Sequence, residues 1–297
     1  KLDLARQLFV RTVETPGGLK VQTIHAFCER LLHLFPFEAN VGARFEAIDE
    51  ETQRTLLEEA QLTVLHGDAD DPDGQLARAL ALVAAETTAA GFEGLLRTIV
   101  GKGAALKLAS KLQANGLRRE LGCRLGLAAG EDRQTIAGAI LEEGILEADL
   151  TTAIALLGAS SVNDMKLAEK LRAAMAEDDS MERATAYANC FFNASDDKPS
   201  KTLGTKKIPE HVRNQLAHEQ QRMIGLRDKL RAAVTLDRTC ALYLLADEVH
   251  GQYNRFKAVR GYLDFNDLIE RAATLLNRSD AGWILYKLDS GIDHILV

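Results

Sequence analysis

The sequence predicts a mainly α-helical protein with short βα pieces near its two ends. Alanine and leucine are abundant, aromatic residues make up only 5% of the chain, and there are just five prolines. This balance favours helices over a β-sandwich or a barrel. Strand character is confined to segments near the termini, whereas helical spacing of apolar residues dominates between them. At 297 residues the chain has room for about two domains.

Boundary signals place the first elements of the chain. A helix is expected over residues 1–14, where a Pro-Gly-Gly turn ends it. Residues 19–22 suit a short strand, and Thr23 suits the N-cap of a helix that stops near Pro36, because its hydroxyl can accept a free backbone N–H of the first turn. Helical spacing predicts one buried face for this helix, made by Ile24, Phe27, Leu31 and Leu34.

Capping residues, glycines and prolines divide the rest of the chain. Asp49 suits the N-cap of a helix over 50–66, and short glycine-punctuated helices are expected from 75 to 148. A polar stretch that lacks periodicity, residues 193–209, predicts an exposed loop, and the apolar segment 292–297 predicts a buried strand. Further helices are expected over 162–176, 181–192, 210–234, 236–259 (nearly continuous with the one before) and 265–276.

Composition and charge narrow the classes of protein. The four cysteines are scattered without a C-x-x-C pair, which argues for a reducing, cytoplasmic setting and against a zinc site or a disulfide framework. No apolar run reaches the ~20 residues of a membrane span, and Lys1 leads into an amphipathic helix rather than a signal peptide. The formal net charge of −7 counts against a chain that wraps nucleic acid over its whole surface, but it leaves room for a local basic track.

Three segments, in the same order, resemble those of one helicase family. Residues 23–28 read Thr-Ile-His-Ala-Phe-Cys and resemble the Thr-x-His-x-Phe-Cys motif of UvrD/Rep-type superfamily 1A DNA helicases. Residues 263–269 resemble the family's Leu-Asp-Phe-x-Asp-Leu-Ile segment, and residues 292–297 resemble its Walker B strand just before the metal-binding Asp-Glu pair. Within the family, residues 14–25 and 203–207 are most similar to the AddA subunit of the RecBCD-like AddAB helicase–nuclease.

The resemblance implies how the fold is divided. In the family, a helical domain called 1B is inserted between these motifs into 1A, a RecA-like P-loop motor domain. Residues 1–44 would then belong to domain 1A, residues 45–260 to a helical 1B-like domain, and residues 261–297 to the return to domain 1A that ends in the Walker B strand. The missing initiator Met suits an internal piece of such a protein, between its Walker A and Walker B motifs.

The resemblance also implies an activity for the full protein. It would be an ATP-dependent 3′-to-5′ DNA helicase that uses ATP and Mg²⁺, processes double-strand breaks for repair and recombination, and pairs with an AddB-like subunit. Whether an exonuclease domain accompanies it stays open. The 297 residues contain neither a Walker A loop nor the Walker B acids, so this piece alone is expected to hold no cofactor and to hydrolyse no ATP. Gly101-Lys102-Gly103 is no exception, because Leu96 stands where a Walker A loop needs glycine.

Candidate single-strand contacts lie on the helix that Thr23 opens. From pattern alone, Thr23 is a cap, His25 a surface side chain and Phe27 a core residue. The resemblance implies that this segment touches single-stranded DNA, where an aromatic ring can stack on a base while a hydroxyl or an imidazole bonds the backbone. Phe27 still suits packing, and Arg30 suits a DNA contact and a solvated surface position equally well.

A basic stretch in the 193–209 loop and the helix after it is the second candidate. The loop carries Lys198, Lys201, Lys206 and Lys207, and the helix adds Arg213, Arg222, Arg227, Lys229 and Arg231. A local surplus of cations in an acidic chain suits a phosphate-binding patch, although a solvated loop and helix face explains it about as well. Because domain 1B of the family lies against the duplex, the four loop lysines are expected to contact duplex DNA.

The acidic motif near the C-terminus is expected to be structural. Asp264 and Asp267 open a helix, where carboxylates are favoured electrostatically, so we expect capping rather than a metal site. With Phe265 they mark the family's landmark segment without a catalytic role. Two other classes stay open. DNA binding that survives loss of Thr23 and His25 would favour a stand-alone helical DNA-binding module, and no oligonucleotide binding at low salt would favour a helical protein–protein scaffold.

Overall fold

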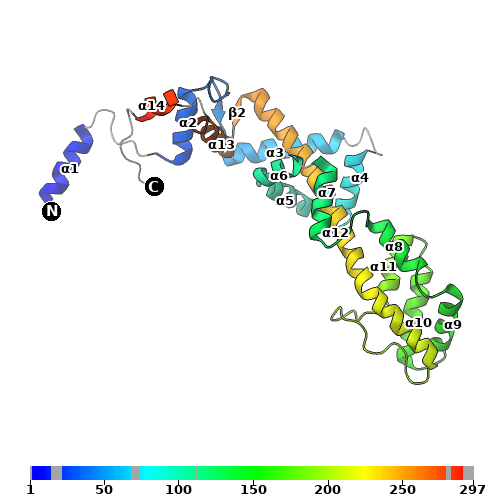
Figure 1. Ribbon diagram of the computed structural model, residues 1–297. Coiled ribbons are helices and arrows are strands. Elements are labelled where there is room, and N and C mark those ends of the chain that lie inside the picture. The colour runs from blue at the N-terminus through cyan, green and yellow to red at the C-terminus, as the bar shows by residue number, and fades with distance from the viewer. Residues whose placement is uncertain (1, 15–21, 68–73, 112, 279–281, 290–297) are drawn as a thin grey trace. The chain divides into compact units, whose positions relative to one another are not determined.

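The chain folds predominantly into α-helices in the computed structural model, which confirms the expected mainly helical class (Figure 1). The structure describes residues 2–14, 22–67, 74–111, 113–278 and 282–289. The chain divides into two compact units: the first unit joins Lys1–Asp70 to Glu248–Val297, and the second unit is Asp71–Asp247. The domain division expected from the family, at residues 44 and 260, uses other boundaries and stays a prediction.

The first unit brings together segments from the two ends of the sequence. It contains α1 (Leu2–Glu14), α2 (Ile24–Leu34), β1 (Glu46–Ala47), α3 (Glu50–Gly67), β2 (Tyr262–Leu263), α13 (Phe265–Leu276) and α14 (Gly282–Asp289). The strands β1 and β2 pair in parallel, with Glu46 opposite Tyr262 and Ala47 opposite Leu263. This short ladder fixes the register in which the chain returns to the first unit.

The core of the first unit lies between α2 and α13. Helix α2 packs against α13, and the side chains of Leu32 and Leu275 are fully buried in their contact. The other buried members of this cluster are Cys28, Leu31, Phe35, Phe45, Leu263, Leu268, Ala272 and Ile284. Helix α1 is different, since none of its residues is buried.

The second unit is a set of short helices followed by most of one long helix. Its short helices are α4 (Gln75–Ala84), α5 (Ala89–Val100), α6 (Gly103–Lys111), α7 (Gln113–Arg124), α8 (Arg133–Glu142), α9 (Glu147–Gly158), α10 (Val162–Met175) and α11 (Ser180–Asn189). The long helix, α12 (Glu210–Arg260), spans 51 residues and contributes to both units. The two nearly continuous helices expected around residue 235 are therefore one, and the Thr235 hydroxyl donates back to the Arg231 carbonyl at 2.8 Å without interrupting it.

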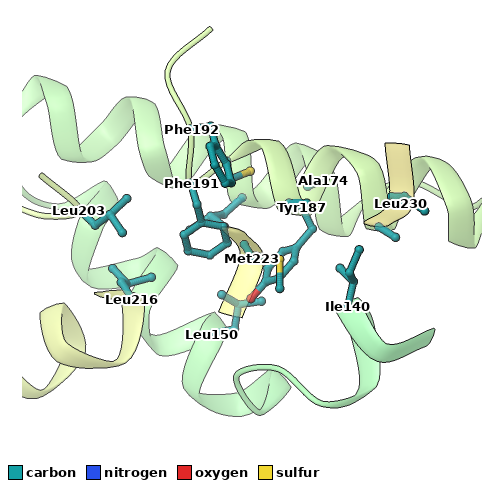
Figure 2. Packing of buried hydrophobic residues seen from close by; sticks show 14 of the residues in the cluster. Ile140, Leu150, Ala174, Tyr187, Phe191, Phe192, Leu203, Leu216, Met223 and Leu230 are labelled. Atoms are coloured by element: carbon teal, nitrogen blue, oxygen red, sulfur yellow. The ribbon is translucent and has the colours of Figure 1, made fainter. Parts of the chain in front are cut away.

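The main core of the second unit gathers around the aromatic rings that end α11. Figure 2 shows Tyr187 and Phe191 in the middle of this packing, with Leu203 and Leu216 on one side and Ile140 on the other. The two rings meet edge to face with their centroids 5.4 Å apart, a geometry that aromatic pairs prefer. Large apolar side chains from several short helices are thus buried together against α12.

Several local expectations need correction. Ile24 and Leu34 are 60% and 61% exposed, because the face of α2 that meets α13 is centred on Cys28, Leu31 and Leu32. The 193–209 loop is not exposed throughout, since Leu203 and Ile208 are buried in the core of the second unit. The elements that sequence patterns did not predict are α9, α14 and the β1–β2 pair.

Other expectations are confirmed or concern residues outside those that the structure describes. The helices that follow Thr23 and Asp49 begin where these caps place them, and short helices do fill the glycine-rich region after residue 74. The Pro-Gly-Gly turn, residues 19–21 of the first strand and the strand expected over 292–297 lie outside the residues that the structure describes.

Candidate functional site

Thr23 is the N-cap of α2, as its place before an apolar helical run predicts. Its backbone is extended (φ −71°, ψ 160°), and its hydroxyl oxygen accepts a hydrogen bond from the Ala26 N–H at 3.2 Å. A hydroxyl has two lone pairs and one O–H donor, so the cap uses only part of its capacity. The side chain is exposed and keeps a donor for an external acceptor.

His25 lies beside the start of α13. Its imidazole is half-buried and meets the ring of Phe265 with a centroid distance of 4.7 Å and an angle of 43° between the rings. Residues 25 and 265 meet only through the packing of α2 on α13. Sequence reasoning treated Phe265 as a landmark and missed this contact, because no local pattern reports a neighbour so distant in the chain.

Phe27 and Arg30 lie on the other side of α2. At about 100° per residue, His25 and Phe27 flank the buried face of the helix on opposite edges, and Arg30 lies beyond Phe27 toward solvent. Phe27 is half-buried and packs against the core of the first unit, whereas Arg30 is exposed and forms no ion pair with any described residue. The four candidate residues share one helix, but the structure does not gather them at one point.

The start of α13 is held by a buried network of charges. Asp264 caps α13 in a reciprocal capping box with Asp267 (2.8 Å to the Asp267 N–H and 3.2 Å back to the Asp264 N–H). The Lys257 ammonium, near the end of α12, donates to both carboxylates at 2.7 and 2.6 Å. Tyr253 adds its hydroxyl to Asp264 at 2.8 Å. The structure therefore shows the capping that the sequence favours for these carboxylates.

The charges and hydrogen bonds of this network shift the pKa values of Asp264 and Tyr253. Burial works against the charged form of Asp264, but the Lys257 ammonium, the N–H of Asp267 and the Tyr253 hydroxyl outweigh it and hold the pKa of Asp264 below its usual range. Burial, followed by the negative charge of Asp264, raises the pKa of Tyr253. Asp264 is thus a buried, paired carboxylate, and among the described residues no cluster of His, Cys, Asp and Glu suits a metal ion.

The four loop lysines are exposed on a loop that is anchored at several points. Lys198, Lys201, Lys206 and Lys207 all lie between α11 and α12, and within the described ranges none of them forms an ion pair. Phe192 and Pro199 pair as an isolated antiparallel bridge inside the loop. Four positive charges are therefore presented to solvent by a backbone with fixed hydrogen bonds.

The side chain of Gln220 ties the loop to α12. Its amide nitrogen donates to the carbonyl oxygens of Phe191 and Ser200, both at 2.9 Å. Farther along the loop, the backbone N–H and the hydroxyl of Thr205 donate to the Asp164 carboxylate at 2.9 and 2.6 Å. Burial raises the pKa of Asp164, but hydrogen bonds from Thr205 and two serine hydroxyls outweigh it, and the net shift is downward.

The basic residues of α12 are mostly engaged inside the second unit. Arg222 pairs with Glu219, Arg227 and Arg231 share Asp197, Lys229 pairs with Glu131, and Arg213 donates to the Ile208 carbonyl. The sequence therefore overstates the positive charge that this helix offers to a partner. The four loop lysines carry most of the unneutralised charge of the basic stretch, since in α12 only Arg227 and Arg231, which share one carboxylate, and Arg213, which bonds a carbonyl, are not fully paired.

A known protein family matches nearly the whole chain. The family model described as UvrD/REP helicase N-terminal domain matches residues 10–297, which include α2, the lysine loop and α13. No curated protein matches the chain. In the described part of the chain, no helix combines the length and the apolar character needed to cross a bilayer.

Proposed function

The chain belongs to the UvrD/REP helicase N-terminal domain family, and we propose that it supplies DNA contacts to an AddA-like, ATP-dependent 3′-to-5′ helicase. In this proposal the full helicase acts on double-strand breaks during repair and recombination, together with an AddB-like subunit. The observation that carries the proposal is the family match over residues 10–297, which includes the Thr-Ile-His-Ala-Phe-Cys segment on α2.

The chain offers two surfaces for DNA: one suits single-stranded DNA and the other suits duplex DNA. On the first unit, α2 offers the Thr23 hydroxyl, the Arg30 guanidinium and an imidazole beside an aromatic ring, groups that bind phosphates and stack on unpaired bases. On the second unit, the four loop lysines offer point charges suited to the phosphates of a duplex. Because the loop backbone is anchored by Gln220, binding should cost little ordering entropy.

The described residues do not fit ATP and Mg²⁺, so no step of hydrolysis is assigned to them. Gly101 and Lys102 form a turn between α5 and α6, with Gly101 at the C-cap of α5 and Gly103 as the first residue of α6. A phosphate loop instead joins a strand to the N-terminus of a helix. The carboxylates of Asp264 and Asp267 already share the Lys257 ammonium and cap α13. ATP and Mg²⁺ belong to the proposed full helicase.

Binding to labelled oligonucleotides tests the proposal. We would measure fluorescence anisotropy of the purified chain with a single strand and with a blunt duplex, at 50 and 200 mM salt. Replacing His25 by Ala and Arg30 by Gln should weaken single-strand binding by roughly tenfold, with duplex binding unchanged. Replacing Lys198, Lys201, Lys206 and Lys207 by Gln should weaken duplex binding and lower its salt slope by about 3.6.

Controls and outcomes separate the alternatives. His66→Ala, on the exposed end of α3, should change neither affinity. Single-strand binding that persists without His25 and Arg30, while the loop variant loses all binding, would instead indicate a helical DNA-binding module. An absence of any oligonucleotide binding at 50 mM salt would overturn the proposal and favour a protein–protein scaffold.

A further inference from the structure

A cavity of about 470 Å³ lies in the second unit, beside the start of the lysine loop. Its wall is built by α10, α11, the first part of the loop after α11, and α12. Polar and charged side chains converge on it from segments far apart in the sequence: Lys170, Glu177, Asn189, Asp197, Arg227 and Arg231.

The chemistry of this cavity is set by Arg227. The residue is only 4% exposed, and its guanidinium carbon lies 3.9 Å from the centroid of the Phe192 ring. Its Nε has no hydrogen-bond partner among the described residues. Burial, reinforced by the neighbouring charge of Arg231, lowers the pKa of Arg227 from its ordinary value. A buried guanidinium with unused donor capacity next to a second cation is a strong attractor for an anion.

Asp197 marks the position that such an anion occupies. Its carboxylate bonds Arg227 and also accepts from Arg231 Nη1 and Nη2 at 2.5 and 3.0 Å. The residue adopts a left-handed backbone conformation (φ 57°), which non-glycine residues rarely adopt, and yet its side chain is 58% exposed. A solvent-accessible carboxylate is therefore held between two guanidinium groups by a strained turn of the loop.

We propose that this cavity binds a phosphate group of a nucleic-acid backbone, which replaces the carboxylate of Asp197 between Arg227 and Arg231. The inference rests on the proposed function and names a specific anchoring site within its duplex contact. With Asp197 in place, three cations of the cavity face two carboxylates, whereas only Glu177 opposes them once Asp197 has moved away. Guanidinium groups match the geometry of phosphate oxygens, and the Lys170 ammonium adds a third donor group.

Replacement of the Asp197 carboxylate by a phosphate also links the cavity to the lysine loop. Lys198 follows Asp197 directly, so a phosphate that displaces Asp197 would lie next to one of the four exposed lysines. The loop lysines would then supply general attraction, and the cavity would set where along the backbone the duplex is held. Lys170 is the residue that sequence reasoning could not find, because only the fold brings α10 to this point.

Affinity for a labelled duplex, measured with the full chain over a range of salt concentrations, tests the site. Combined Lys170→Gln and Arg231→Gln changes should lower the salt slope by roughly 2 and weaken binding about tenfold at 0.1 M salt. Lys166→Gln is the matched control, since it removes a lysine one turn earlier on α10 that does not line the cavity. Asp197→Asn removes the competing anion and should tighten binding several-fold.

The outcomes are distinguishable from those of the proposed function. If variants of Lys201, Lys206 and Lys207 lose affinity but the Lys170 and Arg231 variants match Lys166→Gln, the cavity site is overturned and duplex binding by the loop stands. If the Asp197→Asn variant unfolds because Arg227 is left unpaired, the combined Lys170→Gln and Arg231→Gln variant still tests the cavity site. In another outcome, inorganic phosphate raises the melting temperature of the chain above that in matched chloride, and the double variant loses this rise although its duplex affinity is unchanged. This outcome would assign the cavity to free phosphate and overturn the nucleic-acid source.

Discussion

The side chain of Thr23 serves the backbone of its own helix, so its role toward DNA has to be separated from its role as a cap. The oxygen that accepts the Ala26 N–H also belongs to the hydroxyl that faces solvent. Simple truncation to alanine would remove both functions at once. Residue choice at this position can nevertheless keep one function and delete the other, because glycine at an N-cap costs only a few tenths of a kcal/mol and has no side-chain donor.

We predict that Thr23→Ala lowers the free energy of unfolding by about 1 kcal/mol, because the Ala26 N–H loses its acceptor. Thr23→Gly should lose only a few tenths of a kcal/mol of stability and still lose single-strand affinity, and Thr23→Ser should retain both. Urea unfolding and anisotropy on the same samples give the two readings. Equal DNA affinity in the wild type and Thr23→Gly would show that the hydroxyl contributes nothing to binding.

Asp264 is a residue whose charge is stabilised by the fold, and its contribution should depend on pH. The pKa of Asp264 is lower in the folded chain than its ordinary value. Its contribution to stability is therefore fully present above the unfolded pKa near 4 and is lost as the pH falls through the lower folded pKa. The Lys257–Asp264 pair supplies this dependence, since both side chains are only 6% exposed.

Replacing Asp264 by Asn tests this directly. At pH 7 the free energy of unfolding of the variant should be about 2 kcal/mol lower than that of the wild type. The loss stays this small because asparagine still caps α13 and Lys257 keeps Asp267 as a partner. Below pH 4 the difference between variant and wild type should shrink. Urea midpoints measured from pH 7 down to pH 3 report the gap, and a gap of constant size over this range would contradict the assignment.

At the scale of the elements, the lysine loop is an ordered connection rather than a flexible tether. Gln220 on α12 bonds carbonyls on both sides of the Phe192–Pro199 bridge, and Asp164 on α10 holds Thr205. Lys198 and Lys201 lie between these anchor points, and Lys206 and Lys207 directly follow the last of them, Thr205. Their spacing should therefore persist without DNA, which is the condition for a pre-organised contact.

Gln220→Ala should loosen this loop without altering its charge. Two hydrogen bonds would be lost, and the Phe191 carbonyl would keep only the Ser200 N–H as a donor, so the free energy of unfolding should fall by about 2 kcal/mol. Trypsin should then cut faster after Lys201 and Lys206, while Lys198 stays resistant because Pro199 follows it. The adjacent exposed Gln221→Ala is the matched control. A loop that is cut equally fast in both variants would show that Gln220 does not restrain it.

Element boundaries could be predicted from sequence where a local signal decides them. Thr23, Asp49 and Asp264 each cap the helix that their position predicts, because capping depends on residues within one turn. The β1–β2 pair could not be predicted, since two strands of two residues carry no periodicity and pair across a very large loop. The ion-pair partners of the α12 arginines could not be predicted for the same reason, because Asp197 pairs with Arg227 and Arg231 only after the loop has folded onto α12.

At the scale of the whole molecule, the family relation implies ATP hydrolysis, whereas the described residues suit DNA binding. The family match covers residues 10–297 and implies a motor that consumes ATP. The described residues instead provide helices with surfaces suited to DNA, and their one candidate phosphate loop is a turn between helices. DNA binding and ATP hydrolysis should therefore be separable in this chain.

We predict that the purified chain binds DNA but shows no ATPase activity above the background of a buffer control, with or without a single strand. Phosphoryl transfer requires the phosphate-loop lysine and the metal-binding acid together, and the sequence contains no G-x-x-x-x-G-K-[ST] segment. A coupled assay for ADP at saturating ATP and Mg²⁺ measures the rate. The chain in which His25 and Arg30 are replaced controls for contaminating helicases, because a contaminant would hydrolyse ATP equally in both preparations. DNA-stimulated hydrolysis that disappears in that variant would belong to this chain and would overturn the separation of binding from hydrolysis.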